Sequence, residues 1–235
     1  MTKLKNNFVI TVDGPSGAGK STISKKIAAR LNLIYIDTGA MYRAVAWASL
    51  QQKIDLKDTA ALDQLLKNIK IRFQAADDKN LVFCNGHDVT NEIRTPQIDQ
   101  LASAVSGIPA VRNALLPLQR EASRGCAAII DGRDAGTVIF PEAELKIYLD
   151  AELTARARRR LKDQSGSPEI NIQSVTQAIA DRDAADSSRS QAPLRMADDA
   201  ILIDSTKLTI EEVCEKILQL FHVRFGKHEG KPSHE

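Results

Sequence analysis

The sequence predicts a three-layer α/β fold, with helices on both faces of a five-stranded parallel sheet. Short runs rich in Val, Ile and Leu alternate with amphipathic helical stretches, which is the pattern of consecutive strand–helix units. Strands this rich in apolar residues are expected to be buried on both faces, as in a parallel sheet. An aspartate follows each run, so polar side chains gather where the strands end, and open α/β sheets bind ligands at that edge.

The elements of this fold can be placed in order along the chain. We predict strands at residues 8–12, 33–36, 126–130, 145–149 and 200–203. We predict helices at residues 20–31, 40–51, 109–122, 152–163 and 210–225. The core that they form is expected to comprise residues 1–62, 97–151 and 193–226.

Two regions interrupt this alternation. Residues 63–96 hold a helix and two strand-like runs, 69–73 and 81–84, separated by the polar residues 77–80, which indicates a small β-rich insert. Residues 152–192 are strongly charged and have a polar break at 164–170, which is typical of a helical hairpin outside the core. The polar tail, 227–235, is expected to be disordered.

Composition narrows the class of protein. The chain has 235 residues, 43% of them hydrophobic, and a net charge of +2, as in ordinary globular proteins. The three cysteines, Cys84, Cys126 and Cys214, form no C-x-x-C pattern, so we expect neither a disulfide framework nor a cysteine metal site. No stretch approaches 18 apolar residues, and residues 1–7 are polar, so we expect no membrane span, no signal peptide and a cytoplasmic location.

A glycine-rich loop lies between the first predicted strand and the first predicted helix. Residues 14–21 match G-x-x-x-x-G-K-[ST], in which glycines let successive backbone N–H groups point inward at phosphate oxygens. Lys20 would reach the β- and γ-phosphates of ATP, and the Ser21 hydroxyl would ligate Mg²⁺. The predicted ATP-binding residues of the loop are Gly14, Pro15, Ser16, Gly17, Ala18, Gly19, Lys20, Ser21 and Thr22.

A loop of this kind does not by itself identify the reaction that a protein catalyses. A GTPase switch needs an N-K-x-D motif, and the sequence contains no Asn-Lys pair. A cluster of arginines could bind a nucleic acid, yet no aromatic residues interleave with it, and aromatic residues make up only 4% of the chain. The cluster is either a solvated helix face or a lid that brings cations onto transferring phosphates. Its members are Arg156, Arg158, Arg159 and Arg160.

Further motifs follow the second and third strands. Thr38 and Arg43, at the start of a helix, could hold a phosphate, or Thr38 could cap the helix while Arg43 is solvated. Asp131 could lie near Mg²⁺, or could simply end a strand, and Asp37 ends the strand before it. We expect Asp37 or Asp131 to contact the metal through water.

Three charged residues near the end of the helical hairpin share one helix face. On a period of 3.6 residues, Arg182, Asp186 and Arg189 fall within an arc of about 60°. They could form a surface ion pair, or Asp186 could accept hydrogen bonds from sugar hydroxyls while the arginines hold phosphate.

Taken together, these motifs resemble the cytidylate kinase family of the bacterial type. The resemblance covers about residues 7–222 and departs from the family pattern at residues 165–168. It rests on GPSGAGKST at 14–22, DTGAMYRA at 37–44, EIRTPQIDQLASAVSGIPAVR at 92–112, DGRDAGTVIFPEAELKIYLDA at 131–151, RDAADSSRSQAPL at 182–194 and ILIDST at 201–206.

The resemblance implies a P-loop kinase fold in which 63–96 binds the acceptor nucleotide and 152–192 is a lid. It implies transfer of a phosphoryl group from Mg·ATP to CMP or dCMP, by a chain that we expect to be a monomer without nucleic-acid or membrane partners. Another small-molecule kinase, for UMP, dTMP or shikimate, is the alternative.

The resemblance also implies roles for single residues. The matched substrate-binding positions are Thr38, Arg43, Ser103, Arg112, Arg133, Asp134, Arg182, Asp186 and Arg189, of which Ser103, Arg112 and Asp134 match residues that read cytosine. Arg156, Arg159 and Arg160 match lid arginines, of which Arg156 and Arg160 are assigned to ATP binding. The residues expected to act on the transferring phosphate are Lys20, Arg133, Arg159 and Arg189.

Overall fold

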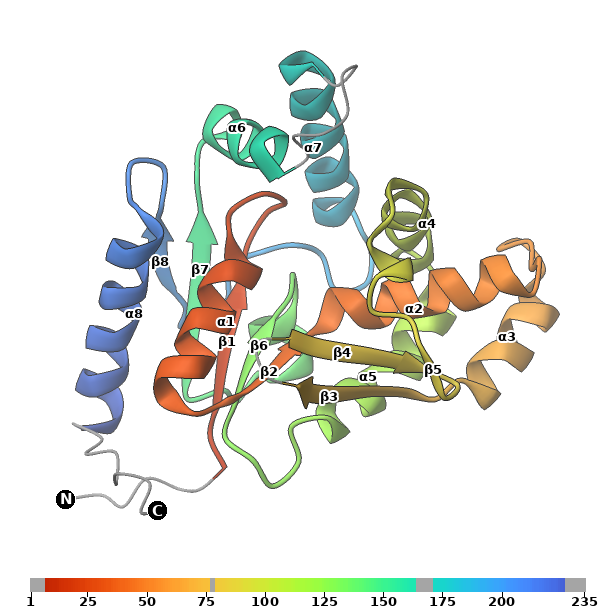
Figure 1. The fold of residues 1–235 in the computed structure, drawn as a ribbon, viewed down its shortest axis with the longest axis horizontal. Coiled ribbons are helices and arrows are strands. Elements are labelled where there is room, and N and C mark those ends of the chain that lie inside the picture. Colours follow the sequence, from red (N-terminus) through yellow and green to blue (C-terminus); the bar gives the residue numbers. More distant parts are fainter. Residues whose placement is uncertain (1–6, 77–78, 164–170, 227–235) are drawn as a thin grey trace.

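A single parallel sheet organises the molecule (Figure 1). This computed structural model describes residues 7–76, 79–163 and 171–226, and five strands of that part form a sheet in the order β2-β6-β1-β7-β8. The strands are β1 (Val9–Asp13), β2 (Ile34–Asp37), β6 (Ala128–Asp131), β7 (Leu145–Asp150) and β8 (Ile201–Asp204). All their pairings are parallel, so the predicted sheet is confirmed, with each strand within about two residues of its predicted bounds.

The inner strands of this sheet are buried on both faces, as their apolar composition predicts, whereas Ile201 and Leu202 of the edge strand β8 are exposed. Side chains of Ile10 and Ile129 join one core cluster with helices α1 (Lys20–Leu31) and α8 (Ile210–Phe225). Ala128 and Ile130, one residue away on β6, point to the opposite face and belong to a second cluster. Alternation along each strand therefore gives the sheet two apolar faces, and covering them makes three layers.

A second body of packed elements lies beside β2. Helix α2 (Thr38–Gln51) is its centre, and α3 (Thr59–Asn68), α4 (Pro96–Ser106) and α5 (Pro109–Glu121) share its apolar cluster. A three-stranded antiparallel sheet of β3 (Ile71–Ala76), β4 (Lys79–Cys84) and β5 (His87–Asp88) completes it. The boundary predicted at residue 63 falls inside α3. The division of the chain into a core, an insert and a lid stays a prediction.

Helix α4 does not appear among the predicted helices, although its signals are present. The hydroxyl of Thr95 accepts a hydrogen bond from the Ile98 N–H, and Pro96 occupies the first turn. A threonine cap followed directly by proline is a common start of a helix.

Two helices lie over the carboxyl ends of the strands (Figure 1). Helices α6 (Leu153–Asp163) and α7 (Ile172–Ser187) pack on each other through Ala157, Val175 and Ile179. The polar break at 164–170 and the tail at 227–235 lie outside the described residues.

Among the described residues, no single helix is both long enough and apolar enough to span a membrane. Helices α4 and α5 reach the required length and apolar composition only when joined across a bend of 99°. Apolar residues of both helices belong to the core cluster around α2.

Candidate active site

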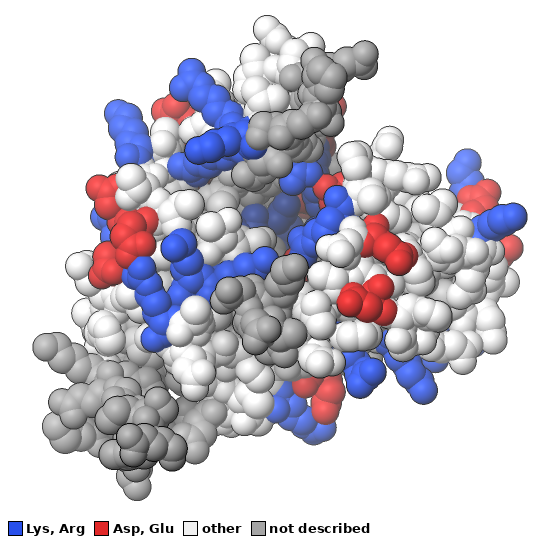
Figure 2. Space-filling model, viewed as in Figure 1, with Lys and Arg blue, Asp and Glu red and all other residues white. Residues whose placement is uncertain are grey.

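A cavity of about 820 Å³ opens at the carboxyl ends of the strands, between the α6–α7 pair and the body around α2. Of the described residues that line it, ten are Lys or Arg and five are Asp. Figure 2 shows blue Lys and Arg side chains gathered along the hollow beneath α6 and α7. A concave site with such an excess of positive charge suits a ligand that carries several negative charges.

The glycine-rich loop forms one wall of the cavity, between β1 and α1. Its first residue, Gly14, has a φ of +146°, and a Cβ there would lie 2.0 Å from the carbonyl oxygen of Leu149 on β7. Only glycine therefore lets the loop leave β1 so close to the next strand. Gly19 ends the loop as the residue before α1, and its φ of +94° again favours glycine.

Lys20 is held inside this loop and is only 5% exposed. Its ammonium group donates a hydrogen bond of 2.8 Å to the carbonyl oxygen of Pro15. Burial, assisted by the positive charge of Arg133, lowers the pKa of Lys20 to about 7. The negative charge of a nearby phosphate would stabilise the protonated form of this buried lysine.

The donor set for a magnesium ion lies next to Lys20. The Ser21 hydroxyl donates a hydrogen bond to the carboxylate of Asp131, and the Tyr35 hydroxyl donates another at 3.1 Å. Burial raises the pKa of Asp131, and the charge of Asp37 adds to the rise. No group of three or more His, Cys, Asp or Glu with metal-binding geometry occurs in the described part of the chain. One hydroxyl and one carboxylate nevertheless fit Mg²⁺, which keeps several waters and binds substrate phosphates.

Asp37 fits this metal less well, because arginines already neutralise it. Arg43 and Arg94 donate hydrogen bonds of 2.7 Å and 3.0 Å to the same carboxylate oxygen. Burial raises the pKa of Asp37, but the two guanidinium groups outweigh it and hold the pKa below its usual value. Asp37 also accepts from the Ala40 N–H and so caps α2, and Thr38 is the first residue of the helix rather than its cap.

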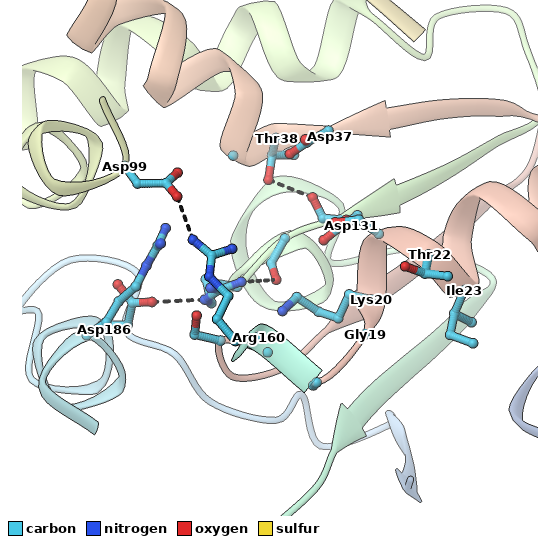
Figure 3. A pocket seen from close by; sticks show the side chains of 18 of the residues that line it. Gly19, Lys20, Thr22, Ile23, Asp37, Thr38, Asp99, Asp131, Arg160 and Asp186 are labelled. Atoms are coloured by element: carbon cyan, nitrogen blue, oxygen red, sulfur yellow. Dashed lines mark hydrogen bonds and ion pairs between the residues drawn. The ribbon is translucent and has the colours of Figure 1, made fainter. Parts of the chain in front are cut away.

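Thr38 and Arg43 both line the cavity, at the start of α2. The Thr38 hydroxyl donates a hydrogen bond of 2.8 Å to the backbone carbonyl of Asp131 (Figure 3). The Nε atom of Arg43 is buried without a hydrogen-bond partner among the described residues. A hydroxyl, a helix start and two arginines thus stand where an anion can bind.

A buried ion pair occupies the deeper part of the cavity. Arg112 of α5 pairs with Asp134, and both side chains are 6% exposed. Arg112 also donates to the carbonyl oxygen of Ser106 at 3.1 Å and lies 5.4 Å from the ring of Tyr42. Burial raises the pKa of Asp134, while the charge of Arg112 opposes the rise. This pair presents a carboxylate and a guanidinium to the same space, and can complement a ligand with both donors and acceptors.

Of the two serines in this part of α4, Ser106 lines the cavity and Ser103 does not. The hydroxyl of Ser106 donates to the Ser103 carbonyl at 2.8 Å and accepts from Arg189 at 2.6 Å. Both serines lie in the same quoted motif, and sequence alone could not tell which hydroxyl faces the cavity.

Asp186 joins two of the predicted phosphate-binding arginines. It accepts a hydrogen bond of 2.9 Å from Arg133 and a second from Arg189, and it is buried. Arg182 stands on the same helix and lines the cavity. Burial, with the charge of Arg133, lowers the pKa of Arg182 to about 10, and its Nε atom has no partner within the described ranges. The predicted Arg-Asp-Arg face therefore points into the cavity.

The three lid arginines of α6 lie in different places. Arg160 reaches across the cavity to Asp99 of α4 at 2.7 Å (Figure 3). Arg159 lines the cavity and donates to the hydroxyl of Ser205 at 3.0 Å. Arg156 is buried, contacts the glycine-rich loop at Ser16, and is not among the residues that line the cavity.

Sequence reasoning missed several charged residues that the fold brings to this site. Arg94 and Asp99 lie within the EIRTPQIDQ segment, but no spacing rule links them to Asp37 or Arg160. Asp13 is buried and accepts hydrogen bonds from the Ala135 and Gly136 N–H groups, at 2.9 and 2.7 Å. It thereby fixes the start of a π-helical turn, η2 (Ala135–Ile139), directly after Asp134.

Comparisons with known proteins agree with this geometry. The model of the family described as "Cytidylate kinase" matches residues 10–223. A protein named cytidylate kinase from Geobacillus sp. (strain WCH70) is 45% identical over 95% of this chain and 100% of its own length. Another so named, from Bacillus cereus (strain ATCC 10987 / NRS 248), is 42% identical over 93% of this chain and 97% of its own length.

The fold also has a counterpart among solved structures. An uncharacterized protein from Eubacterium ventriosum aligns over 92% of this chain and 99% of its own, with a TM-score of 0.51 and 10% identity, which shows a shared fold alone. The family match and the two relatives cover nearly the whole chain, including every motif that lines the cavity. The chain therefore belongs to the cytidylate kinase family.

Proposed function

We propose that this chain transfers the γ-phosphate of Mg·ATP to CMP or dCMP, giving ADP and CDP or dCDP. The observation that carries the proposal is one continuous cavity in which the glycine-rich loop and Lys20 face the arginines around Asp186. A donor site and an acceptor site that share one cavity suit direct transfer between two bound phosphates. The relatives named cytidylate kinase support the same reaction.

Catalysis in this proposal is positioning and charge neutralisation, without a covalent intermediate. Lys20 and Arg133, which both line the cavity, meet the charge of the transferring phosphoryl group. Arg159 and Arg189 add cations from the lid side. Mg²⁺, held by Ser21 and through water by Asp131, supplies neutralisation of the donor phosphates when bound.

Thr38, Arg43 and Arg94 hold the acceptor phosphate in this proposal, while Arg182 and Asp186 hold its sugar. The Arg160–Asp99 bridge supports closure of α6 over the cavity, because it joins the lid to the acceptor side. Closure excludes water, which would otherwise compete with CMP for the phosphoryl group of ATP.

Base selection follows from the Arg112–Asp134 pair. Cytosine offers an amino donor at N4 and acceptors at N3 and O2, so a carboxylate beside a guanidinium complements it. Uracil carries a carbonyl in place of that amino group and would leave the Asp134 carboxylate facing an acceptor. We also propose that the enzyme acts as a cytoplasmic monomer without a nucleic-acid partner, which agrees with its near-neutral net charge.

The test is a coupled assay of ADP release with each nucleoside monophosphate and with shikimate as acceptor. We expect CMP and dCMP to give the highest kcat/KM, with UMP and dTMP far below them. A faster reaction with UMP, dTMP or shikimate would instead assign the chain another acceptor, and no ADP release with any acceptor would refute the kinase proposal.

A further inference from the structure

A contact between helices α6 and α7 and the glycine-rich loop is made by two charged residues, Arg156 and Asp183, that do not line the cavity. Asp183 of α7 accepts a hydrogen bond of 2.8 Å from the backbone N–H of Ser16. Arg156 of α6 donates a hydrogen bond of 2.8 Å to the carbonyl oxygen of the same residue. Arg156 and Asp183 also pair with each other, so the two side chains hold both polar groups of one peptide residue.

Further interactions hold Arg156 in place for this contact. The Nε atom of Arg156 donates to the carbonyl oxygen of Ala151 at 2.8 Å, which fixes the direction of the guanidinium group, and Arg156 is buried. Helix α6 also presses closely on the loop. A Cβ on Gly17, whose φ is +77°, would lie 3.1 Å from both the Cβ and the carbonyl oxygen of Arg156. The loop therefore rests directly on this part of the lid.

A carboxylate beside a phosphate-binding loop needs an explanation. A lone negative charge at that place would repel a bound polyanion. Here the charge of Asp183 is matched by Arg156, so the loop keeps its positive character while its backbone is held. The N–H of Ser16 is consequently committed to Asp183, and it is the following loop residues whose N–H groups are available to a phosphate.

We propose that Asp183 and Arg156 are positioning residues for the phosphate donor. They hold Ser16, and with it the glycine-rich loop, in the conformation that binds the phosphates of ATP. Because Asp183 follows Arg182 on α7, the same helix turn that faces the acceptor also fixes the donor loop. Arg156 thus acts through the loop rather than by touching ATP. This inference rests on the proposed function only in taking Mg·ATP as the donor.

Asp183→Asn is the main test, with Asp181→Asn as its matched control. The amide keeps an oxygen for the Ser16 N–H but turns a donor or an uncharged oxygen toward Arg156. Asp181 is on the same helix, is exposed, and accepts a hydrogen bond from Gln177, so its substitution makes the same chemical change without touching the loop. Binding of Mg·ATP is measured by calorimetry without any acceptor, together with thermal melting and the KM of CMP.

We expect Asp183→Asn to weaken Mg·ATP binding by about tenfold or more, as for loss of a charged buried hydrogen bond. The KM of CMP should stay close to that of Asp181→Asn, although the melting temperature should fall because Arg156 loses a buried partner. Equal ATP affinity in the two variants would overturn the proposal. So would an equal loss of affinity for ATP and for CMP, since that would mark a merely structural role. Failure of the wild-type protein to bind Mg·ATP would instead refute the proposed function.

Arg156→Lys gives a second measurement that does not depend on the first variant folding. Lysine keeps the positive charge but lacks the guanidinium group, whose nitrogen atoms bond to Ala151, Ser16 and Asp183 at the same time. We expect weaker Mg·ATP binding, and a double variant no worse than the more affected single one, because both substitutions break the same contact. If the losses of Mg·ATP affinity in the two single variants added up in the double variant, Arg156 would contact ATP independently of Asp183. That result would overturn the shared role.

Discussion

The donor half and the acceptor half of the cavity are built in different ways. The donor half is one continuous segment, residues 14–22, whose shape comes from glycines and whose cation, Lys20, bonds to a carbonyl rather than to a carboxylate. The acceptor half is assembled from α2, α4, α5, α7 and the turn after β6. Its arginines are held by aspartates, such as Asp37 and Asp186.

Side-chain substitutions in the two halves are therefore expected to have different effects on binding and stability. In the proposed donor half we expect the backbone to bind the phosphates, so that a side-chain change acts mainly on the neutralisation of the transferred charge. In the proposed acceptor half Asp37 and Asp186 each pair with two arginines, so loss of either carboxylate leaves cations without a partner and should disturb both binding and stability.

The largest effect is expected for Lys20→Ala. No other lysine or arginine belongs to the loop itself, so removal of the ammonium group should lower kcat by about 10³-fold or more. Lys26→Ala, which changes an exposed lysine of the same helix, serves as control. The assay is coupled ADP release, with a melting curve to show that both variants fold. Normal turnover by a folded Lys20→Ala protein would contradict the assignment of the loop.

Asp186→Asn tests the acceptor half at its most connected point. Loss of the charge leaves Arg133 and Arg189 without their shared buried partner, which should cost about 3–5 kcal/mol of unfolding free energy. The KM of CMP should rise about 10- to 100-fold, while equilibrium affinity for Mg·ATP should change little. Urea unfolding and the two substrate titrations measure these effects. A larger change for ATP than for CMP would place α7 on the donor side instead.

Asp134→Asn sharpens the comparison within the acceptor half, because it should change selectivity more than rate. The amide can turn its NH₂ group toward the carbonyl of uracil, so the preference for CMP over UMP should narrow by about tenfold while CMP activity falls. The ratio of kcat/KM for the two nucleotides is the measurement. If the variant kept the full wild-type ratio, Arg112, Ser106 or the backbone would have to read the base.

The smallest effect is a change in bound protons. Burial, with Arg133 nearby, lowers the pKa of Lys20 to about 7, so at pH 8.5 the free protein holds it mostly neutral. Bound phosphates favour the charged form, so ATP binding at pH 8.5 should take up about one proton. Calorimetry in two buffers of different ionisation enthalpy measures this uptake, and Lys20→Arg, which stays charged, should show none. Zero uptake by the wild-type protein would contradict the lowered pKa.

The same pKa fixes the sign of a stability effect. Between pH 7 and 10.5 the unfolded chain binds the Lys20 proton and the folded protein does not. The contribution of Lys20 to the free energy of unfolding therefore rises with pH across that window.

The sequence was sufficient for the parts of the molecule that depend on local patterns. Five runs rich in Val, Ile and Leu predicted the five strands of the sheet, because strands buried on both faces hold few polar positions. The glycine-rich loop was recognisable since its function depends on neighbours in sequence. Helices α1 and α8 were predicted with their observed bounds.

What sequence patterns could not supply is the pairing of residues far apart in the chain. Asp183 and Ser16 are 167 positions apart, and Arg160 and Asp99 are 61 apart, so no periodicity connects them. The arginines of α6 cannot be told apart by sequence, whereas the fold shows that Arg159 and Arg160 line the cavity and Arg156 does not. Likewise, the choice between Ser103 and Ser106 depends on the rotation of α4, which only packing against α2 and α5 decides.

The contact of Gly14 with β7 has a genetic consequence. Every one-base missense change in a glycine codon introduces a residue with a Cβ, and at position 14 that atom would lie 2.0 Å from a backbone oxygen of Leu149, which has no room to move within the sheet. Gly125, by contrast, has open space around the corresponding point, although its φ is +74°. In a library of all single-nucleotide variants selected for growth on this enzyme, codon 14 should tolerate no missense allele, whereas codon 125 should tolerate several.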